Sequence, residues 1–200
     1  MKVTGILLSL ILLLSFTIKA QDVKIGTQTW TTKNLDVTKY RNGDAIPQVQ
    51  DTTWEKLTTG AWCYYANKTA NGTTYGKLYN WFAVNDTRGL APKGYHIPTD
   101  AEWRILSNYL GEEAGTKMKS TSGWTEDGNG TNSSGFSGLP GGYRDYNGTF
   151  YVIDYKGYWW SSTEDDTEYA WNRGLNCYGR SVITSMDYKQ YGFSVRCLKD

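Results

Sequence analysis

Histidine, cysteine and proline are scarce in this sequence. Its 200 residues include one histidine, three cysteines and four prolines, and no Cys-X-X-Cys motif occurs. A zinc site needs three or four ligands, most often cysteine or histidine, yet His96 has neither residue near it in the sequence. The single histidine also leaves few combinations of residues for nucleophilic catalysis of the Ser-His-Asp type. We therefore expect no zinc site and no enzymatic activity.

An excess of charge of one sign is also missing, and so is a second long apolar run. With 21 lysines and arginines against 20 acidic residues, the chain lacks the basic surface typical of nucleic-acid binding. Lys2, the apolar run at residues 6–14 and Ala20 have the order of a secretory signal peptide over residues 1–20. No later run approaches the ~20 apolar residues of a membrane span. The sequence predicts a secreted chain of residues 21–200, periplasmic or extracellular, without a membrane span after cleavage.

Aromatic residues are abundant, with nine tryptophans, sixteen tyrosines and five phenylalanines. Such a chain can bury a core, and no linker-like tract divides it, so we expect one domain over 21–200. Trp30, Trp62, Trp81, Trp103 and one of Trp159 and Trp160 are expected in that core. Two helices are predicted. One covers residues 75–84 on apolar residues at helical spacing, and one begins at the capping box of Thr99 and Glu102 and stops at Gly111.

Short strands are predicted around these helices, which makes the fold class α+β. They comprise a hairpin over 23–30, a hairpin around Asn147-Gly148, and strands within 158–162, 169–178, 181–186 and 192–198. Residues 31–60 and 112–135 are expected to be long loops. In the last strand Phe193, Val195 and Cys197 alternate with polar residues, which places Cys197 on the buried face.

The three cysteines, Cys63, Cys177 and Cys197, leave three possibilities in an exported chain. Cys63–Cys197 would close nearly the whole domain, a loop worth about 5 kcal/mol in the chain-entropy model. Cys177–Cys197 would join neighbouring C-terminal strands. The third possibility is three reduced, buried thiols.

Six ordered blocks of sequence carry a family resemblance. They are Gly-Tyr-His-Ile-Pro-Thr-Asp-Ala-Glu-Trp at 94–103, Leu-Pro-Gly-Gly-Tyr-Arg-Asp at 139–145, Trp-Trp-Ser-Ser-Thr at 159–163, Gly-Phe-Ser-Val-Arg-Cys at 192–197, and the segments 60–64 and 75–81. Over about residues 23–199 the chain resembles the Fibrobacter succinogenes major paralogous domain family.

The resemblance implies a C-type lectin-like fold, with two helices flanking a mixed or antiparallel sheet and long loops. It implies a secreted or surface protein, most often of Bacteroidetes-like bacteria, and a distant similarity to formylglycine-generating enzymes. In C-type lectin-like domains the cysteine of the final strand usually bonds to one near the first helix, which favours Cys63–Cys197.

We expect no cofactor, and calcium is the alternative that the loops leave open. The lectin motifs Glu-Pro-Asn and Gln-Pro-Asp are absent, and Trp171-Asn172-Arg173 has arginine where the lectin Trp-Asn-Asp motif has a metal-binding aspartate. The usual lectin mechanism is therefore not expected. Oxygen-rich loops remain as candidates for Ca²⁺, with the residues Asp127, Asn129, Asp165 and Asp166; the alternative is that they are solvated turns.

A mixture of aromatic, amide and guanidinium side chains occupies residues 164–191. The candidate ligand-binding residues there are Tyr169, Trp171, Asn172, Arg173, Asn176, Tyr178 and Arg180. Aromatic residues of this kind anchor ligands and protein interfaces. We expect a non-catalytic module that recognises a glycan or a cell-surface protein through this face. The alternatives are a structural, surface-assembly module and a formylglycine-generating oxidase, which would need a copper-binding cysteine pair.

Overall fold

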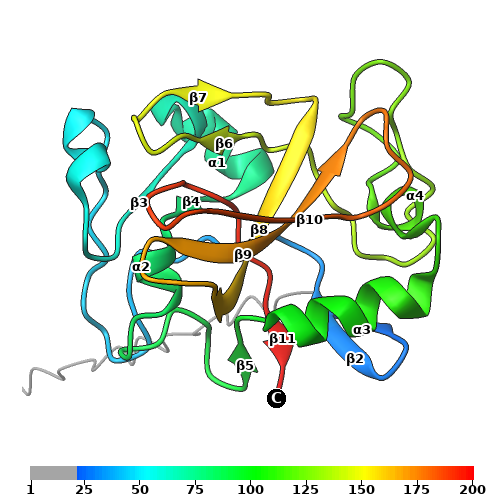
Figure 1. Ribbon diagram of the computed structural model, residues 1–200, viewed down its shortest axis with the longest axis horizontal. Coiled ribbons are helices and arrows are strands. Elements are labelled where there is room, and N and C mark those ends of the chain that lie inside the picture. The colour runs from blue at the N-terminus through cyan, green and yellow to red at the C-terminus, as the bar shows by residue number, and fades with distance from the viewer. Residues whose placement is uncertain (1–21) are drawn as a thin grey trace, which may run out of the picture.

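The computed structural model describes residues 22–200 (Figure 1). The predicted signal peptide at 1–20 lies outside the described residues. The structure is α+β, as the sequence predicts.

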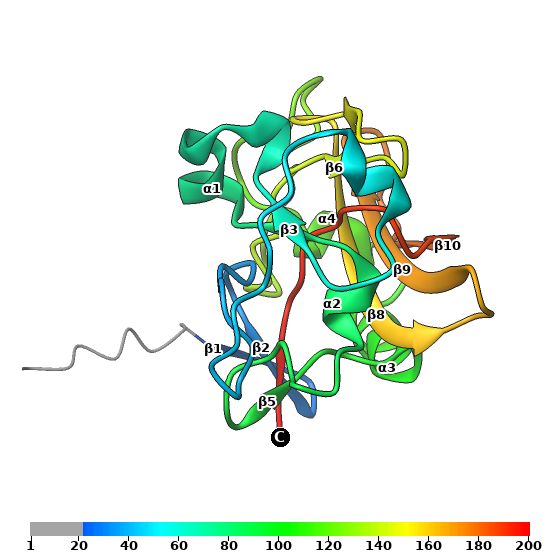
Figure 2. The same cartoon turned by 90° about the vertical axis from the view of Figure 1, so that its left-hand side faces the viewer.

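The two ends of the described chain meet in one antiparallel sheet. Its strand order is β1-β2-β11-β5, formed by β1 (Asp22–Ile25), β2 (Gln28–Thr31), β11 (Leu198–Lys199) and β5 (Tyr95–His96). Figure 2 shows the last strand lying between these N-terminal and central segments. The predicted N-terminal hairpin is confirmed, and Gly26 adopts the positive φ of 61° that its tight turn requires.

A second antiparallel sheet crosses the middle of the molecule (Figure 1). It has the order β10-β9-β8, formed by β8 (Lys156–Glu164), β9 (Tyr169–Asn176) and β10 (Ile183–Tyr188). Two small hairpin-like pairs flank it. They are β3 (Trp62–Cys63) with β4 (Leu78–Tyr79), and β6 (Tyr143–Arg144) with β7 (Phe150–Tyr151). The turn between β6 and β7 contains the predicted Asn147-Gly148 pair.

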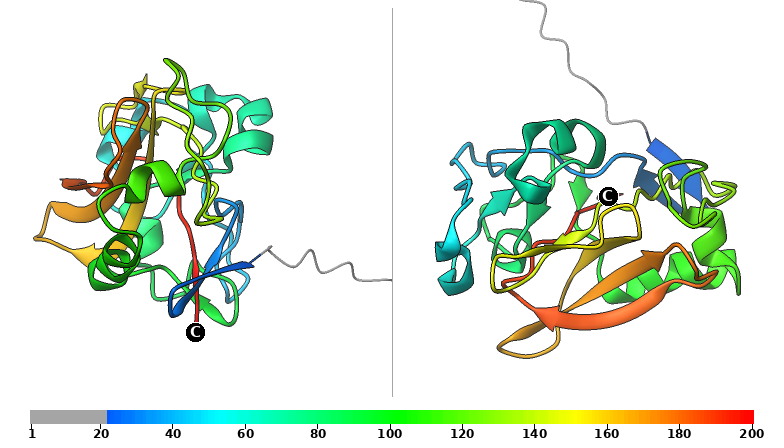
Figure 3. Two further views of the ribbon diagram at one scale, coloured as in Figure 1. Left: turned by 90° about the vertical axis from the view of Figure 1, so that its right-hand side faces the viewer. Right: turned by 90° about the horizontal axis from the view of Figure 1, so that it is seen from above.

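Helix α3 (Asp100–Leu110) forms as predicted. Thr99 and Glu102 make the full capping box, Trp103, Leu106 and Leu110 are buried, and Gly111 ends the helix. The other helical segments are short: η1 (Thr52–Lys56), η2 (Tyr65–Asn67), α1 (Thr69–Tyr75), α2 (Trp81–Val84) and α4 (Ala114–Met118). Figure 3 shows α3 and α4 at the side of the central sheet. The α4 helix interrupts the loop that was predicted over 112–135.

The predicted helix over 75–84 is wrong in its first half. Gly76, with a φ of 75°, ends α1, and Leu78 and Tyr79 then pair with Cys63 and Trp62 as strand β4. Asn80 starts a new helix by accepting a hydrogen bond from the Ala83 amide. The expected arrangement of two helices flanking a sheet is thereby reduced to one helix of 11 residues and several shorter ones.

The core consists of three clusters of buried side chains. Trp159 and Trp160, adjacent on β8, point to opposite faces of the sheet and enter different clusters. One cluster contains Trp62, Trp81, Trp160 and Phe193. The second contains Trp30, Trp103, Phe136 and Trp159, and the third is built on Trp54. The tryptophans that the sequence predicts as core are all buried, and Trp159 and Trp160 are both among them.

The predicted Cys63–Cys197 disulfide is wrong, because all three cysteines are free. Each thiol lies in a different core cluster: Cys197 beside Phe193, Cys177 in the cluster of Trp159, and Cys63 beside Leu78. Burial raises the pKa of Cys63 and of Cys197 to about 12. The stability of the domain therefore comes from packing and from buried polar contacts.

Buried cations are the second unexpected feature of the interior. Six basic side chains are almost fully buried, namely Lys77, Lys119, Arg144, Arg173, Lys189 and Arg196. Lys77, Arg173 and Lys189 each have a carboxylate partner. Arg144, Lys119 and Arg196 instead donate to backbone carbonyls of loops. Arg196 occupies a position where the alternating pattern predicts an exposed side chain. Buried cations thus fix the positions of long loops in this fold through hydrogen bonds.

The single histidine joins the C-terminal residue to the start of α3. His96 Nδ1 lies 2.8 Å from an Asp200 carboxylate oxygen, and Nε2 lies 2.9 Å from Glu102 Oε1. Burial alone would lower the pKa of His96, but the hydrogen bonds to Asp200 and Glu102 outweigh it and raise that pKa.

When folding raises the pKa of a histidine, the resulting stabilisation is fully present below the pKa of the unfolded chain, which is near 6.5. It is lost as the pH rises through the pKa of the folded protein. Because the His96 side chain is 38 % exposed, solvent screening limits the expected loss to about 0.5 kcal/mol. Denaturant unfolding at pH 5.5 and pH 8.5 should show this loss in the wild type and not in His96→Gln. The same pH dependence in both proteins would contradict the assignment.

Candidate functional site

Six tyrosines from five parts of the chain form one connected group of ring contacts beside the central sheet. This tyrosine face consists of Tyr143, Tyr146, Tyr158, Tyr169, Tyr188 and Tyr191. Tyr169 and Tyr188 are partners in the β9–β10 register, with ring centroids 4.5 Å apart. The turn after β6 brings the Tyr146 ring to 5.3 Å from Tyr188, and Tyr143 stacks on Tyr191 at 5.6 Å. Tyr158 lies edge-on to Tyr143.

A hollow of about 480 Å³ opens beside Tyr146 and Tyr188. Those two tyrosines are 42 % and 37 % exposed, so ring surface is available to a ligand. The lining of the hollow comes from η1 and the residues after it, α2, the turn after β6, the turn before β9 and the end of β10. The hollow is lined by Glu55, Thr58, Phe82, Tyr146, Thr167, Glu168, Tyr188, Lys189 and Gln190. Lys189 turns inward, because its ammonium group is bound by Glu164 and by the carbonyls of Asp166 and Thr167.

Two carboxylates, the acidic pair Asp145 and Asp187, lie close to the rings of Tyr143 and Tyr191. Asn172 Nδ2 donates to Asp187 at 2.8 Å, and the Tyr191 hydroxyl lies 3.4 Å from Asp145 Oδ2. The pKa of Asp187 is raised by its burial and by the charge of Asp145. Burial, followed by the acidic pair, raises the pKa of Tyr191, so its phenol stays neutral. Asn172 Oδ1 is buried and has no hydrogen-bond partner.

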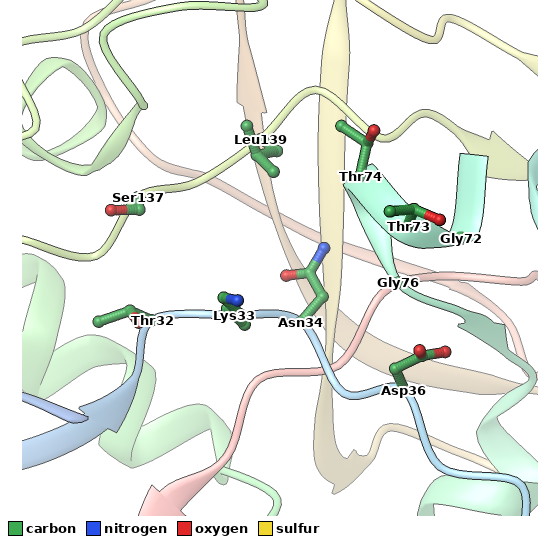
Figure 4. Close-up of a pocket in the computed structure, with 10 residues that line it drawn as sticks. All are labelled: Thr32, Lys33, Asn34, Asp36, Gly72, Thr73, Thr74, Gly76, Ser137 and Leu139. Carbon is green, nitrogen blue, oxygen red and sulfur yellow. The ribbon is translucent and has the colours of Figure 1, made fainter. Parts of the chain in front are cut away.

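A larger groove, of about 630 Å³, lies on another side, between residues 32–36, α1 and residues 137–139 (Figure 4). Its central polar groups already have partners. Asn34 donates to the Tyr75 carbonyl and to Ser194, and accepts from Trp159 Nε1 and Arg196 Nε. Asp36 is paired with the buried Lys77. We therefore interpret this groove as a place where structural segments meet, and the tyrosine face as the candidate site.

The residues predicted from sequence separate into two groups along β9. Tyr169 belongs to the tyrosine face, and Asn172 lies beneath it through its bond to Asp187. Trp171 is half-buried next to them in the strand. Arg173 is fully buried and bonds Asp100 Oδ1 at 2.5 Å. Arg173 therefore anchors α3 to the sheet.

The remaining predicted residues lie at the other end of β9. Asn176 accepts a hydrogen bond from the Gly179 amide, Arg180 pairs with Glu113 at 3.1 Å, and Tyr178 is 75 % exposed. An eight-residue strand spans about 26 Å, so these residues lie far from Tyr169 and Tyr188. The residues of the candidate site that were not predicted are Tyr143, Asp145, Tyr146, Tyr158, Asp187, Tyr188 and Tyr191. Three Asp-Tyr pairs occur in the sequence, at 145–146, 154–155 and 187–188, and the first and third of them lie at this site.

The four calcium candidates are dispersed. Asn129 Oδ1 accepts from the Trp124 amide, and one oxygen of Asp166 accepts from the amides of Glu168 and Tyr169. Asp165 is exposed in the same turn, and Asp127 lies in the separate 126–132 loop with a φ of 54°. Within residues 22–200 no group of three or more acidic, histidine or cysteine side chains is placed to hold a metal ion.

In the part of the chain that the structure describes, the helices are too short or too polar for a bilayer crossing. Comparison with curated proteins and with solved structures gave no match. A family model does match, that of the Fibrobacter succinogenes major domain, over residues 23–199. The match covers all the elements described above, and the chain therefore belongs to the Fibrobacter succinogenes major domain family.

Proposed function

We propose that this domain is a secreted or surface-exposed, non-catalytic glycan-binding module with a C-type lectin-like fold, and that the tyrosine face is its ligand face. The observation that carries the proposal is the exposure of the Tyr146 and Tyr188 rings beside a polar hollow. Tyrosine supplies an apolar ring and a hydroxyl, which match the two kinds of surface that a sugar presents.

The lining of the hollow favours a sugar over a peptide. Hydroxyl, amide and carboxylate groups, including Thr58, Thr167 and Gln190, surround a small aromatic area. A peptide groove is instead expected to offer apolar pockets for anchor side chains. The tyrosines also pack against one another, so the binding surface is ordered before the ligand arrives.

An assembly role is the second candidate, and one observation favours it. Strand β10 ends the order of the central sheet, with Ile183 and Met186 36 % and 47 % exposed. An edge strand with apolar side chains is a template for pairing with another chain. A defined oligomer of residues 21–200 in light scattering would favour assembly.

Replacing Tyr188 by alanine is expected to weaken glycan binding about tenfold or more, since a buried aromatic contact is worth ~1–2 kcal/mol. Binding of residues 21–200 to glycan and polysaccharide arrays, with calcium and then with EDTA, provides the measurement. Tyr178→Ala is the matched control, because Tyr178 is exposed at the far end of β9. Equal losses in both variants would argue against the tyrosine face, and an array that stays silent with folded wild type would refute glycan binding.

A further inference from the structure

We infer that the tyrosine face binds an ammonium group, and that its ligand is a glycan containing unacetylated amino sugars. This inference rests on the proposed glycan-binding function and names the class of sugar. It is carried by three features of the site: an acidic pair without counter-ions, a buried acceptor without a donor, and the surrounding tyrosine rings.

The acidic pair has no cationic partner. Among the described residues, no lysine, arginine or histidine nitrogen lies within 4.0 Å of the carboxylates of Asp145 or Asp187, although other acidic residues have such pairs. Arg144, which precedes Asp145, turns away to the ring of Trp54 and the carbonyls of residues 49–51. The hollow beside Tyr146 and Tyr188 contains two further carboxylates, Glu55 and Glu168. A ligand that reaches the acidic pair meets two carboxylates without a counter-ion.

One buried acceptor beside this pair lacks a donor. Asn172 is 0 % exposed and its amide nitrogen is directed at Asp187, while its oxygen has no partner. A buried acceptor without a donor costs free energy. An ammonium group has three N–H donors and no acceptor, and so complements this set. A neutral sugar hydroxyl supplies one donor and no charge.

The tyrosine rings near the acidic pair provide aromatic faces that attract a cation. Tyr143, Tyr158 and Tyr191 are close enough to Asp187 for its charge to raise the pKa of each of them, although burial is the larger cause. Their phenols are therefore neutral at pH 7. A cation within about 6 Å of an aromatic face is attracted by the ring. Tyrosine faces combined with carboxylates favour an ammonium group over an uncharged one.

The groups that face Asp187 also determine how its charge, and therefore ligand binding, depends on pH. They come from β6 and its turn (Tyr143, Asp145), from β8 (Tyr158), from β9 (Asn172) and from the segment after β10 (Tyr191). None of these groups is a cation. Because the pKa of Asp187 is raised, its carboxylate is protonated at a higher pH than an ordinary aspartate, and binding should weaken as pH falls through that value.

The test compares two probes of equal length, a glucosamine tetramer and its fully N-acetylated form, by calorimetry at pH 6. The wild type should bind the glucosamine tetramer at least about tenfold more tightly, as expected for charge-assisted hydrogen bonds. Asp187→Asn should remove that preference and still fold, because asparagine keeps an acceptor for Asn172 and removes a half-buried charge. Asp165→Asn is the matched control, since Asp165 is exposed outside the acidic pair.

Each other outcome has a distinct meaning. Equal binding of the two tetramers, or tight glucosamine binding that survives Asp187→Asn, would overturn the ammonium inference and leave glycan binding intact. A lysine-rich peptide that binds through Asp187 while the glucosamine tetramer does not would overturn the assignment to a sugar. If neither tetramer binds and the glycan arrays are silent, the proposed function fails as well.

Discussion

Replacing Arg196 by methionine is expected to lower the free energy of unfolding by about 4 kcal/mol or more. The guanidinium is fully buried and donates to the carbonyls of Thr31, Phe136 and Ser137 at 2.7–3.0 Å, and to Asn34 Oδ1 at 2.7 Å. Burial lowers the pKa of Arg196 to about 9, so the group is still charged at pH 7. Methionine fills part of the space and removes the guanidinium donors from the three carbonyls, while Asn34 Oδ1 keeps the hydrogen bond from Trp159 Nε1.

Denaturant unfolding at pH 7 measures this loss. Arg180→Met is the matched control, because the Arg180 side chain is 79 % exposed in its pair with Glu113. The control should change the free energy of unfolding by less than ~0.5 kcal/mol. A loss below about 1 kcal/mol for Arg196→Met would show that water or a neighbouring donor replaces the guanidinium.

Arg144→Met should cost about 3 kcal/mol of stability and also weaken ligand binding. The Arg144 guanidinium donates to the carbonyls of Val49, Asp51 and Gly148, and lies 4.4 Å from the ring centroid of Trp54. It therefore holds the turn that carries Asp145 and Tyr146, so its removal should free that turn.

The two effects can be measured on the same variants. Unfolding gives the stability loss, and titration with the glucosamine tetramer gives the binding loss at a temperature where the variant is folded. Arg144→Lys should rescue little of either property, because an ammonium group cannot reproduce the flat fork of donors. Full rescue by lysine would show that charge alone, rather than this geometry, positions the turn.

Local sequence signals predicted those elements that local chemistry determines. The capping box of Thr99 and Glu102 fixed the start of α3, and the Asn147-Gly148 pair fixed a hairpin. Leu78 and Tyr79 were misassigned because their spacing to Phe82 and Ala83 also fits a helix. Their strand conformation depends on pairing with Cys63 and Trp62, which lie 15 and 17 residues earlier in the sequence, and a local period carries no such information.

The candidate site was only partly predictable for the same reason. Tyr169 and Tyr188 lie in neighbouring strands, so a C-terminal face could be anticipated. Asp145 and Tyr146 reach that face through a turn that is held by Arg144, and nothing local in the sequence indicates this contact. The burial of Arg173 and Arg196 was equally hidden, because arginine in an alternating pattern normally predicts a solvent-facing position.

The distribution of the three thiols gives the molecule a built-in set of reporters. Each core cluster contains one cysteine, and each of these cysteines is buried. A buried thiol reacts with an alkylating reagent only when the structure around it opens. The alkylation rates of Cys63, Cys177 and Cys197, read peptide by peptide, would therefore give the opening free energy of each cluster. Equal rates would mean that the domain opens as one unit, and unequal rates would rank its parts by stability without any introduced label.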